Sequence, residues 1–348
     1  MNLKTISDSI LDEGSSSSQL RDALNAFARL CGDVSNIRPD PSFDAWADDA
    51  LLDSGVAINP RAAAHCVVDY QRSVVFIRGV YAALNALQSR FPASVIDILY
   101  AGCGPFATLL LPLLGRFTPG ELDITLLDIH RRSLDSAEQL LTHLGLAAHS
   151  IHTVQGDASS YQHSGKLHLV IAETMQKALE QEPQFAVTAN LAPQLCRSGI
   201  FIPQNIAVEL CLADLEYEKT LFAQSQQIDT GVLEHNGKRH TLANICTLSP
   251  ELAAAQLRKA QYNHHSSKLE LEPTLVSIPL LKELARFDAA LFTRIQVFEQ
   301  YCLGDYECEI TLPLKCHDLA PLVAGARYRV GYQLGNYPRF NVTRLDDN

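Results

Sequence analysis

The sequence predicts an α/β fold built on a doubly wound parallel sheet, with helices before the sheet and a β-rich domain after it. Between residues 95 and 173, short apolar runs alternate with segments of helical spacing, as in strand–helix–strand units of a parallel sheet. After Pro203 short strand-like runs dominate instead. A chain of 348 residues is long enough for one full core and a second, smaller one.

The N-terminal part reads as helical. Apolar residues recur at helical spacing from Leu20 towards Leu52, and the pattern is broken by Pro39 and Pro41. A longer helical pattern covers residues 60–87. We interpret the first of these segments as a helical cap on the domain that follows.

The central part predicts strands and helices in alternation. Each expected strand is a short apolar run, and two of them end directly at an acidic residue. The strands are expected at 95–100, 123–127, 150–154 and 167–172, and the helices at 106–114 and 133–144. Because ligands of such sheets bind at the carboxyl ends of the strands, the residues after each strand are the candidates for a site.

The C-terminal part predicts a β-rich, barrel-like domain with one helical segment. Its strands are expected at 206–211, 276–279, 295–298, 306–312 and 328–334, and its helix at 250–262. The expected domains are an N-terminal helical cap over 1–60, a Rossmann-like domain over 61–203 and a β-rich substrate or oligomerisation domain over 204–348.

The amino-acid composition argues against several classes of function. The net charge of −11 argues against nucleic acid, whose binding depends on Lys and Arg, and suits a cationic substrate. No apolar run is long enough to span a membrane, and we expect a cytoplasmic protein. The nine cysteines follow no metal-site spacing, so Cys308, Cys316 and His317 are interpreted as core or loop residues and no metal is expected.

A glycine turn follows the first strand of the central part, in the run Tyr100-Ala101-Gly102-Cys103-Gly104. Two glycines two residues apart let the backbone approach a ligand closely. The third position of a dinucleotide-binding fingerprint is occupied by Ala107, which that fingerprint tolerates. The turn by itself therefore leaves a dinucleotide open as the ligand.

Acidic residues at the ends of two further strands favour a different ligand. Asp128, about 26 residues after Gly102, is placed to accept hydrogen bonds from ribose hydroxyls. Asp157, followed by Ala158, closes the next strand and is placed to meet an adenine amino group. Two strand-end acids beside one glycine turn fit an adenosine–methionine ligand better than a dinucleotide.

Over residues 66–210 this pattern resembles the class I S-adenosylmethionine-dependent methyltransferases. The usual acid before the first glycine is absent, since Tyr100 and Ala101 stand there, so we expect the backbone near Gly102 to hold the methionine amine. The resemblance implies S-adenosyl-L-methionine as the cofactor, bound by Arg72, Ala101, Gly102, Cys103, Gly104, Asp128, Asp157 and Ala158.

Two glutamates nine residues apart are the candidate catalytic residues. Glu173 ends the fourth strand and Glu182 follows it, a spacing similar to the double-E loop of protein arginine methyltransferases. The run from Asp69 to Arg72 is similar to that family's Asp-x-x-Arg, whose arginine pairs with the cofactor carboxylate. Paired carboxylates hold a planar guanidinium bidentately and localise its charge, which makes one nitrogen more nucleophilic. Glu180 is a rival for the second role.

The resemblance is incomplete, which bears on the substrate. The loop has Thr174, Met175 and Gln176 where that family has aromatic and glycine residues, and the C-terminal half has no Thr-His-Trp signature. We therefore expect a small-molecule variant acting on a guanidino or amino nitrogen, with arginine in a peptide as the other acceptor. Tyr332, Tyr337 and Arg339 are candidates to face the substrate from the β-rich domain, although such aromatic residues more often pack a sheet.

Three other functions stay open. The first is an O- or C-methyltransferase of a small natural product, in which the glutamates are structural or act as general base. The second is a non-catalytic scaffold that binds the cofactor. The third is a dinucleotide oxidoreductase. The segment 249–273 is interpreted as either a dimerisation arm, as in the resembled family, or a substrate cover, so a homodimer is one expectation.

Overall fold

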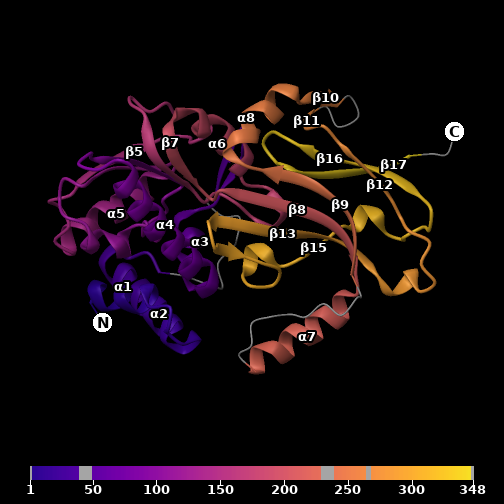
Figure 1. Ribbon diagram of the computed structural model, residues 1–348, viewed down its shortest axis with the longest axis horizontal. Helices are drawn as coiled ribbons and strands as arrows, with labels where there is room; N and C mark the ends of the chain where they lie inside the picture. Colours follow the sequence, from indigo (N-terminus) through magenta and orange to yellow (C-terminus); the bar gives the residue numbers. More distant parts are fainter. Residues whose placement is uncertain (1, 39–48, 229–238, 264–267, 346–348) are drawn as a thin grey trace.

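The protein has two lobes that lie side by side, one built on a parallel sheet covered by helices and one rich in antiparallel strands (Figure 1). The computed structural model describes residues 2–38, 49–228, 239–263 and 268–345, and for 223–228 only the backbone. Pro39 and Pro41, at which the helical pattern of the sequence breaks, lie outside the described residues.

A five-stranded, wholly parallel sheet forms the first lobe, in the order β5-β4-β3-β6-β7. The chain runs outward from β3 through β4 to β5 and then returns to β6 on the other side of β3. The strand order therefore reverses between β3 and β6. The strands are β3 (Ile96–Ala101), β4 (Leu122–Asp128), β5 (Ser150–Gln155), β6 (Leu167–Ala172) and β7 (Leu195–Ile202).

Both faces of this sheet are buried, which confirms the predicted doubly wound fold. In β3, Ile98 and Tyr100 belong to the large core that includes residues of α4 (Tyr70–Arg90) and α5 (Arg131–His143). Leu99 and Ala101 point to the opposite face and pack with residues of α6 (Gln184–Leu191). Because successive side chains of a strand alternate between faces, one apolar run supplies both cores.

One predicted helix of this lobe is wrong. Instead of an α-helix over 106–114, the chain forms turns and then the 3-10 helix η2 (Leu111–Arg116). Pro112 has no N–H to donate and its ring crowds the carbonyl four residues back. Ala107 has a left-handed backbone with φ 42°, which interrupts any helix there. No α-helix therefore begins behind the glycine turn.

The N-terminal helices pack on the side of the first lobe. They are α1 (Leu3–Leu11) and α2 (Ser17–Ser35), and α2 contacts α5 and the 3-10 helix η1 (Cys66–Val68). A capping box between Ser16 and Gln19 fixes the start of α2. Of the helices in the described ranges, none combines the length and the apolar character needed to cross a membrane.

A short hairpin, absent from the sequence-based expectation, precedes the first long helix. Its strands are β1 (Ala50–Leu52) and β2 (Gly55–Ala57), paired antiparallel. The helical pattern expected over 60–87 is divided into α3 (Pro60–His65), η1 and α4. Asp69, with φ −73° and ψ 80°, separates η1 from α4, so the last two elements meet at an angle.

The second lobe consists of two antiparallel sheets. One has the order β14-β13-β8-β9 with β15 beside β13, and the other has the order β10-β11-β16-β12 with β17 beside β16. The first sheet is built from β8 (Asn205–Ala213), β9 (Arg239–Leu248), β13 (Asp288–Phe298), β14 (Tyr301–Leu303) and β15 (Leu314–Lys315). The second is built from β10 (Gln261–Asn263), β11 (Lys268–Glu270), β12 (Thr274–Ser277), β16 (Arg327–Gln333) and β17 (Arg339–Leu345).

The structure of this lobe differs from the sequence-based prediction in two segments. The strand expected over 306–312 is wrong, because Tyr306 has φ 66° and a 3-10 helix, η6 (Glu309–Thr311), follows. The described part of 249–273 forms α8 (Pro250–Lys259), β10 and β11, and α8 packs on α6 of the first lobe. The element that projects from the body is α7 (Leu215–Ile228) (Figure 1).

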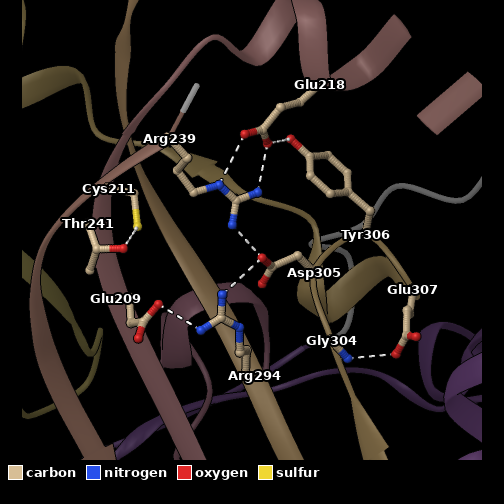
Figure 2. A network of polar contacts seen from close by, with 10 residues as sticks. All are labelled: Glu209, Cys211, Glu218, Arg239, Thr241, Arg294, Gly304, Asp305, Tyr306 and Glu307. Carbon is tan, nitrogen blue, oxygen red and sulfur yellow. Dashed lines mark hydrogen bonds and ion pairs between the residues drawn. The ribbon is translucent and has the colours of Figure 1, made fainter. Parts of the chain in front are cut away.

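A buried charge network anchors the base of α7 (Figure 2). Arg239 donates from Nε and one Nη to the two oxygens of Glu218, at 3.0 and 2.9 Å, and from its other Nη to Asp305. Arg239 also lies over the ring of Phe292, with the guanidinium carbon 3.7 Å from the ring centre. Arg294, on β13, continues the network from Asp305 to Glu209 of the neighbouring strand β8. The pairing joins α7 to β9 and to the chain after β14.

Candidate functional site

One cavity, the strand-edge cavity, lies at the carboxyl ends of β3, β4, β5 and β6. It holds about 980 Å³ of space, counting its opening to solvent. This is the place where the strand order reverses, where doubly wound sheets bind their ligands. Of the predicted site residues, nine line it: Arg72, Gly102, Cys103, Gly104, Asp128, Asp157, Ala158, Glu173 and Glu182.

Ala101 is the exception among the predicted site residues. Its side chain is fully buried in the core on the α6 side of the sheet. The alternation of a strand explains this position, because Ala101 is the last residue of β3 and Gly102 is the first residue of the turn.

The glycine turn is held open by the backbone of the neighbouring strand. The amides of Gly102 and Cys103 both donate to the carbonyl of Leu127, at 2.9 and 3.3 Å. Gly102 and Gly104 have φ values of 68° and 61°, in the left-handed region that favours glycine. A Cβ atom at Gly102 would stand 2.5 Å from Cγ2 of Thr174. The turn therefore requires glycine at 102 for two separate reasons.

We expect Gly102→Ala to lower the stability of the fold and to weaken ligand binding in the strand-edge cavity. The left-handed backbone alone costs an alanine about 1–2 kcal/mol, and Thr174 must also move. Gly145→Ala is the matched control, since Gly145 has φ 70° but nothing within 4 Å of an added Cβ. Thermal denaturation should show a larger loss for Gly102→Ala, and titration with S-adenosylhomocysteine should show weaker binding for this variant alone. Equal losses and unchanged binding would contradict the role of the turn.

Asp128 is oriented by two backbone amides. One carboxylate oxygen accepts from the amide of Gly104 at 2.9 Å and the other from the amide of His130 at 2.8 Å. Burial raises the pKa of Asp128, while these two hydrogen bonds favour the anion and oppose the rise. Each oxygen keeps a further lone pair, so the carboxylate can still accept hydrogen bonds from a ligand.

Asp157 lies after β5 on the same edge of the sheet. One oxygen accepts from the amide of Ser159 at 2.8 Å, which closes an Asx turn. Asp157 and the following Ala158 both line the strand-edge cavity. The turn fixes the carboxylate at the far end of the cavity from β6.

Arg72 and Glu173 form an ion pair within the cavity. The guanidinium of Arg72 donates from one Nη to Oε1 of Glu173, and both side chains are nearly buried. Burial raises the pKa of Glu173, and the bonded guanidinium opposes the rise. Arg72, which the resemblance assigned to the cofactor carboxylate, thus has a carboxylate partner within the chain. Its guanidinium has five donors, enough to serve both.

Glu182 is the second glutamate of the cavity. Only 7 % of this residue is exposed. Burial raises the pKa of Glu182 to about 8, the carboxylates of Glu173 and Asp49 add to the rise, and Arg72 opposes it. The rival candidate, Glu180, does not line the cavity and lies instead near Arg339 and Asp318 of the second lobe. The nine-residue spacing therefore identifies the pair that shares one cavity.

The raised pKa of Glu182 predicts a pH-dependent stability. Between its ordinary pKa near 4.5 and about 8, the folded protein keeps a proton that the unfolded chain has lost. The free energy of unfolding therefore falls as pH rises through this window, by up to about 1.4 kcal/mol per pH unit. The cost of the buried charge is absent below pH 4.5 and complete above about 8.

Thermal denaturation of Glu182→Gln between pH 5 and 9 measures this effect. We expect the variant to gain stability over the wild type progressively as pH rises, because the other ionisable groups cancel in the difference. A difference that does not change with pH would show that Glu182 is not buried in the protonated form.

The loop that carries the two glutamates, residues 173–182, has a strained backbone. Ala178, Leu179 and Gln181 have positive φ values of 55°, 57° and 67°. Non-glycine residues hold such conformations only where surrounding contacts impose them. These contacts come from distant segments. The Ala178 amide donates to the hydroxyl of Thr293, and the hydroxyl of Tyr332 donates to the Leu179 carbonyl. The Gln181 amide donates to the Pro338 carbonyl, and the Gln181 carbonyl accepts from the Val56 amide.

Comparison with family models and with curated proteins gives no match for this sequence. Among solved structures, the chain is similar to the Trypanosoma brucei PRMT1 enzyme–prozyme heterotetrameric complex with AdoHcy. The TM-score is 0.45 at 12% identity, over 80% of this chain and 96% of that chain. It is also similar to Arabidopsis thaliana protein arginine methyltransferase 10, with a TM-score of 0.45 at 10% identity over 76% and 84% of the two chains. At this level of similarity, function has to be inferred from the site itself.

The structure shows further residues around the strand-edge cavity that the sequence did not predict. Gln184 is fully buried and fastens the start of the two-glutamate loop, accepting from the amide and hydroxyl of Thr174 and donating to the Ala172 carbonyl. The β1–β2 hairpin contributes Leu52 and Ala57 to the cavity wall. Neither Gln184 nor the hairpin is marked by a sequence motif. Glutamines and short strand-like runs occur throughout the sequence, so nothing distinguishes these as part of a site. Tyr332 supports the loop and does not line the cavity.

Proposed function

We propose that the protein is an S-adenosylmethionine-dependent N-methyltransferase that acts on a guanidino or amino nitrogen. The observation that supports it best is that Glu173 and Glu182 line one cavity together with the glycine turn and Asp128. Glu182 is buried, and the side chain of Glu173 is only 13 % exposed. A ligand with a nucleoside at one end and a reactive cation at the other matches this arrangement.

The residues of the strand-edge cavity fit that cofactor. Gly102 and Gly104 leave room for close approach of the methionine part, and the cavity is large enough for a molecule of this size. Asp128 keeps lone pairs free and would accept from the ribose hydroxyls, and Asp157, which lines the cavity after β5, would accept from the adenine amino group. Arg72 has donors left for the methionine carboxylate. When bound, S-adenosylmethionine supplies an electrophilic methyl group on a sulfonium ion.

The two carboxylates favour a guanidinium acceptor over an ammonium. A guanidinium is planar and offers parallel N–H groups to two carboxylates at once, and it stays charged because its pKa is above 12. The same carboxylates would keep an amine protonated, and an ammonium nitrogen has no lone pair to attack with. Glu173 and Glu182 therefore hold the acceptor and orient one nitrogen for in-line displacement.

Methylation of a guanidinium releases one proton from the attacking nitrogen. A carboxylate near the acceptor can take it. With a pKa of about 8 in the empty site, Glu182 is largely protonated at neutral pH, so it can accept this proton only after the entering cation has displaced its own. Glu173 is tied to Arg72 and is the weaker base of the two. Glu182 is thus the proposed proton acceptor, and Glu173 the fixed anion.

The dinucleotide alternative loses its main support. A pyrophosphate binds at the N-terminus of an α-helix that opens directly behind the glycine turn. Here the chain forms turns from Gly104 to Leu110, and a 3-10 helix, not an α-helix, begins at Leu111. An O- or C-methyltransferase with Glu182 as general base, or a scaffold without turnover, would use the same cofactor site.

Two measurements test the proposal. Thermal shift should show stabilisation by S-adenosylhomocysteine and none by NAD. With methyl-labelled cofactor, label should pass to free L-arginine or to an arginine-containing peptide, and not to citrulline, which has the same shape without the charge. Label on neutral hydroxyl compounds only would favour the O-methyltransferase, and cofactor binding without transfer to any acceptor, cell extract included, would favour the scaffold.

A further inference from the structure

The turn after β5, residues 157–161, brings an acceptor and a donor to the wall of the strand-edge cavity. We call it the Asp157 turn. The carboxylate of Asp157 accepts from the amide of Ser159 at 2.8 Å and has lone pairs left for a ligand. Ala158 also lines the cavity and is only 8 % exposed, and its amide donates to no protein acceptor in the part of the chain that the structure describes. Backbone donors of such buried residues nearly always have a partner, so this amide is available to a bound ligand.

Asn190, near the end of α6, fixes the backbone of the Asp157 turn. Its side-chain nitrogen donates to the carbonyls of Ala158 and Tyr161, at 3.0 and 2.8 Å. Because a side-chain amide has two N–H donors, both are used on this turn. The side-chain oxygen of Asn190 accepts from the side-chain amide of Gln162 at 3.1 Å. These three contacts together determine which way the Asn190 amide points.

The contacts of Asn190 reach the residues that line the cavity, although Asn190 itself does not line it. The Ala158 carbonyl belongs to the same residue as the unused amide, and the Tyr161 amide closes the turn on the Asp157 carbonyl at 3.0 Å. Val187, three residues before Asn190 and on the same face of α6, lines the cavity and packs in one apolar cluster with Ala158. An effect of Asn190 on a ligand therefore acts through the turn.

An adenine base is complementary to the Asp157 turn, and a 6-oxopurine is not. The 6-amino group of adenine donates and its N1 accepts, which suits the carboxylate of Asp157 and the amide of Ala158. In hypoxanthine both are reversed, because O6 accepts and N1 carries a hydrogen. Each mismatched pair leaves a buried polar group without a partner, so discrimination requires both protein groups to keep their positions.

We propose that Asn190 is a positioning residue that sets the base specificity of the cofactor site. It holds the Asp157 turn so that an adenosyl ligand is bound and the corresponding inosyl ligand is rejected. The inference rests on the proposed function for the nature of the cofactor. Leucine and aspartate are close to asparagine in size and have no N–H to donate, so Asn190→Leu and Asn190→Asp both release the two carbonyls of the turn.

Calorimetric titration of the full-length protein with S-adenosylhomocysteine and S-inosylhomocysteine measures this discrimination as a ratio of dissociation constants. We expect the wild type to bind the adenosyl compound at least about 100-fold more tightly, about tenfold for each mismatched pair. Asn190→Leu and Asn190→Asp should each reduce the ratio by at least about tenfold, so one variant suffices if the other folds poorly. Asn85→Asp, which places the same charge at an exposed position of α4, should leave the ratio unchanged.

The ratio separates positioning from a general loss of stability. A cavity that is only disturbed loses affinity for both compounds alike, so an unchanged ratio in the Asn190 variants would overturn the proposal. A wild type that binds S-adenosylhomocysteine and S-inosylhomocysteine equally well would also overturn it, while the proposed cofactor would stand. Binding of neither compound by the wild type would refute the proposed function, and this inference with it.

Discussion

Glu173→Gln should abolish most of the turnover while cofactor binding stays nearly intact. The amide oxygen of glutamine can still accept from Arg72, so the buried guanidinium keeps a partner and the cavity keeps its shape. The negative charge that holds the acceptor is lost, and removing one such electrostatic contact from a preorganised site costs about 10²–10³-fold in turnover. Single-turnover assays with labelled cofactor and calorimetry with S-adenosylhomocysteine measure the two effects separately.

Glu180→Gln is the control for this variant. Glu180 belongs to the same loop but does not line the strand-edge cavity. It should reduce turnover only slightly. Near-normal turnover of Glu173→Gln would remove Glu173 from the mechanism, and equal losses in the two variants would indicate that the loop is disturbed as a whole.

Arg239→Met should strongly destabilise the second lobe. It removes the cation that Glu218 and Asp305 share in the interior (Figure 2). Breaking a buried ion pair by removing one partner costs about 3–5 kcal/mol, because the remaining charge stays buried. The loss of contact with the Phe292 ring adds to this. Chemical denaturation at neutral pH gives the change in the free energy of unfolding.

Arg286→Met is the matched surface control. Arg286 is about half exposed and pairs with Asp214 and Glu283 at 3.1 and 2.8 Å. Exposed pairs contribute about 0–1 kcal/mol, so this variant should unfold nearly as the wild type does. Replacing Arg239 together with Glu218→Gln and Asp305→Asn should recover part of the loss, since no charge is then left buried. Similar stabilities for both arginine variants would show that the network contributes little.

The two-glutamate loop depends on both lobes for its conformation. Its left-handed residues are held by Thr293 and Tyr332 of the second lobe and by Val56 of the hairpin. These residues lie outside the cavity wall. The arrangement explains how the two-glutamate loop can do without glycine at three positions of positive φ, because hydrogen bonds from distant segments impose a conformation that the local sequence disfavours.

The sequence by itself determined the doubly wound sheet and the edge at which the site lies. Apolar runs that alternate with helical spacing are a local signal, and parallel strands necessarily bring their carboxyl ends to one edge. This is why Gly102, Asp128, Asp157 and Glu173 could be expected in one place from strand ends alone. Ala101 fell one residue inside the strand, where the alternation of side chains turns it into the core.

Only the tertiary structure decided how these residues are paired. The Arg72–Glu173 ion pair joins residues that are 101 positions apart, and the carbonyl of Gln181, next to Glu182, accepts from the amide of Val56 in a hairpin that has no sequence signature. The α-helix expected behind the glycine turn is absent because Pro112 disfavours it and because Ala107 has a left-handed backbone, and of these two causes only the proline is visible in the sequence. Periodicity reports which side of an element is buried, whereas the charge of a buried carboxylate depends on neighbours that folding alone brings together.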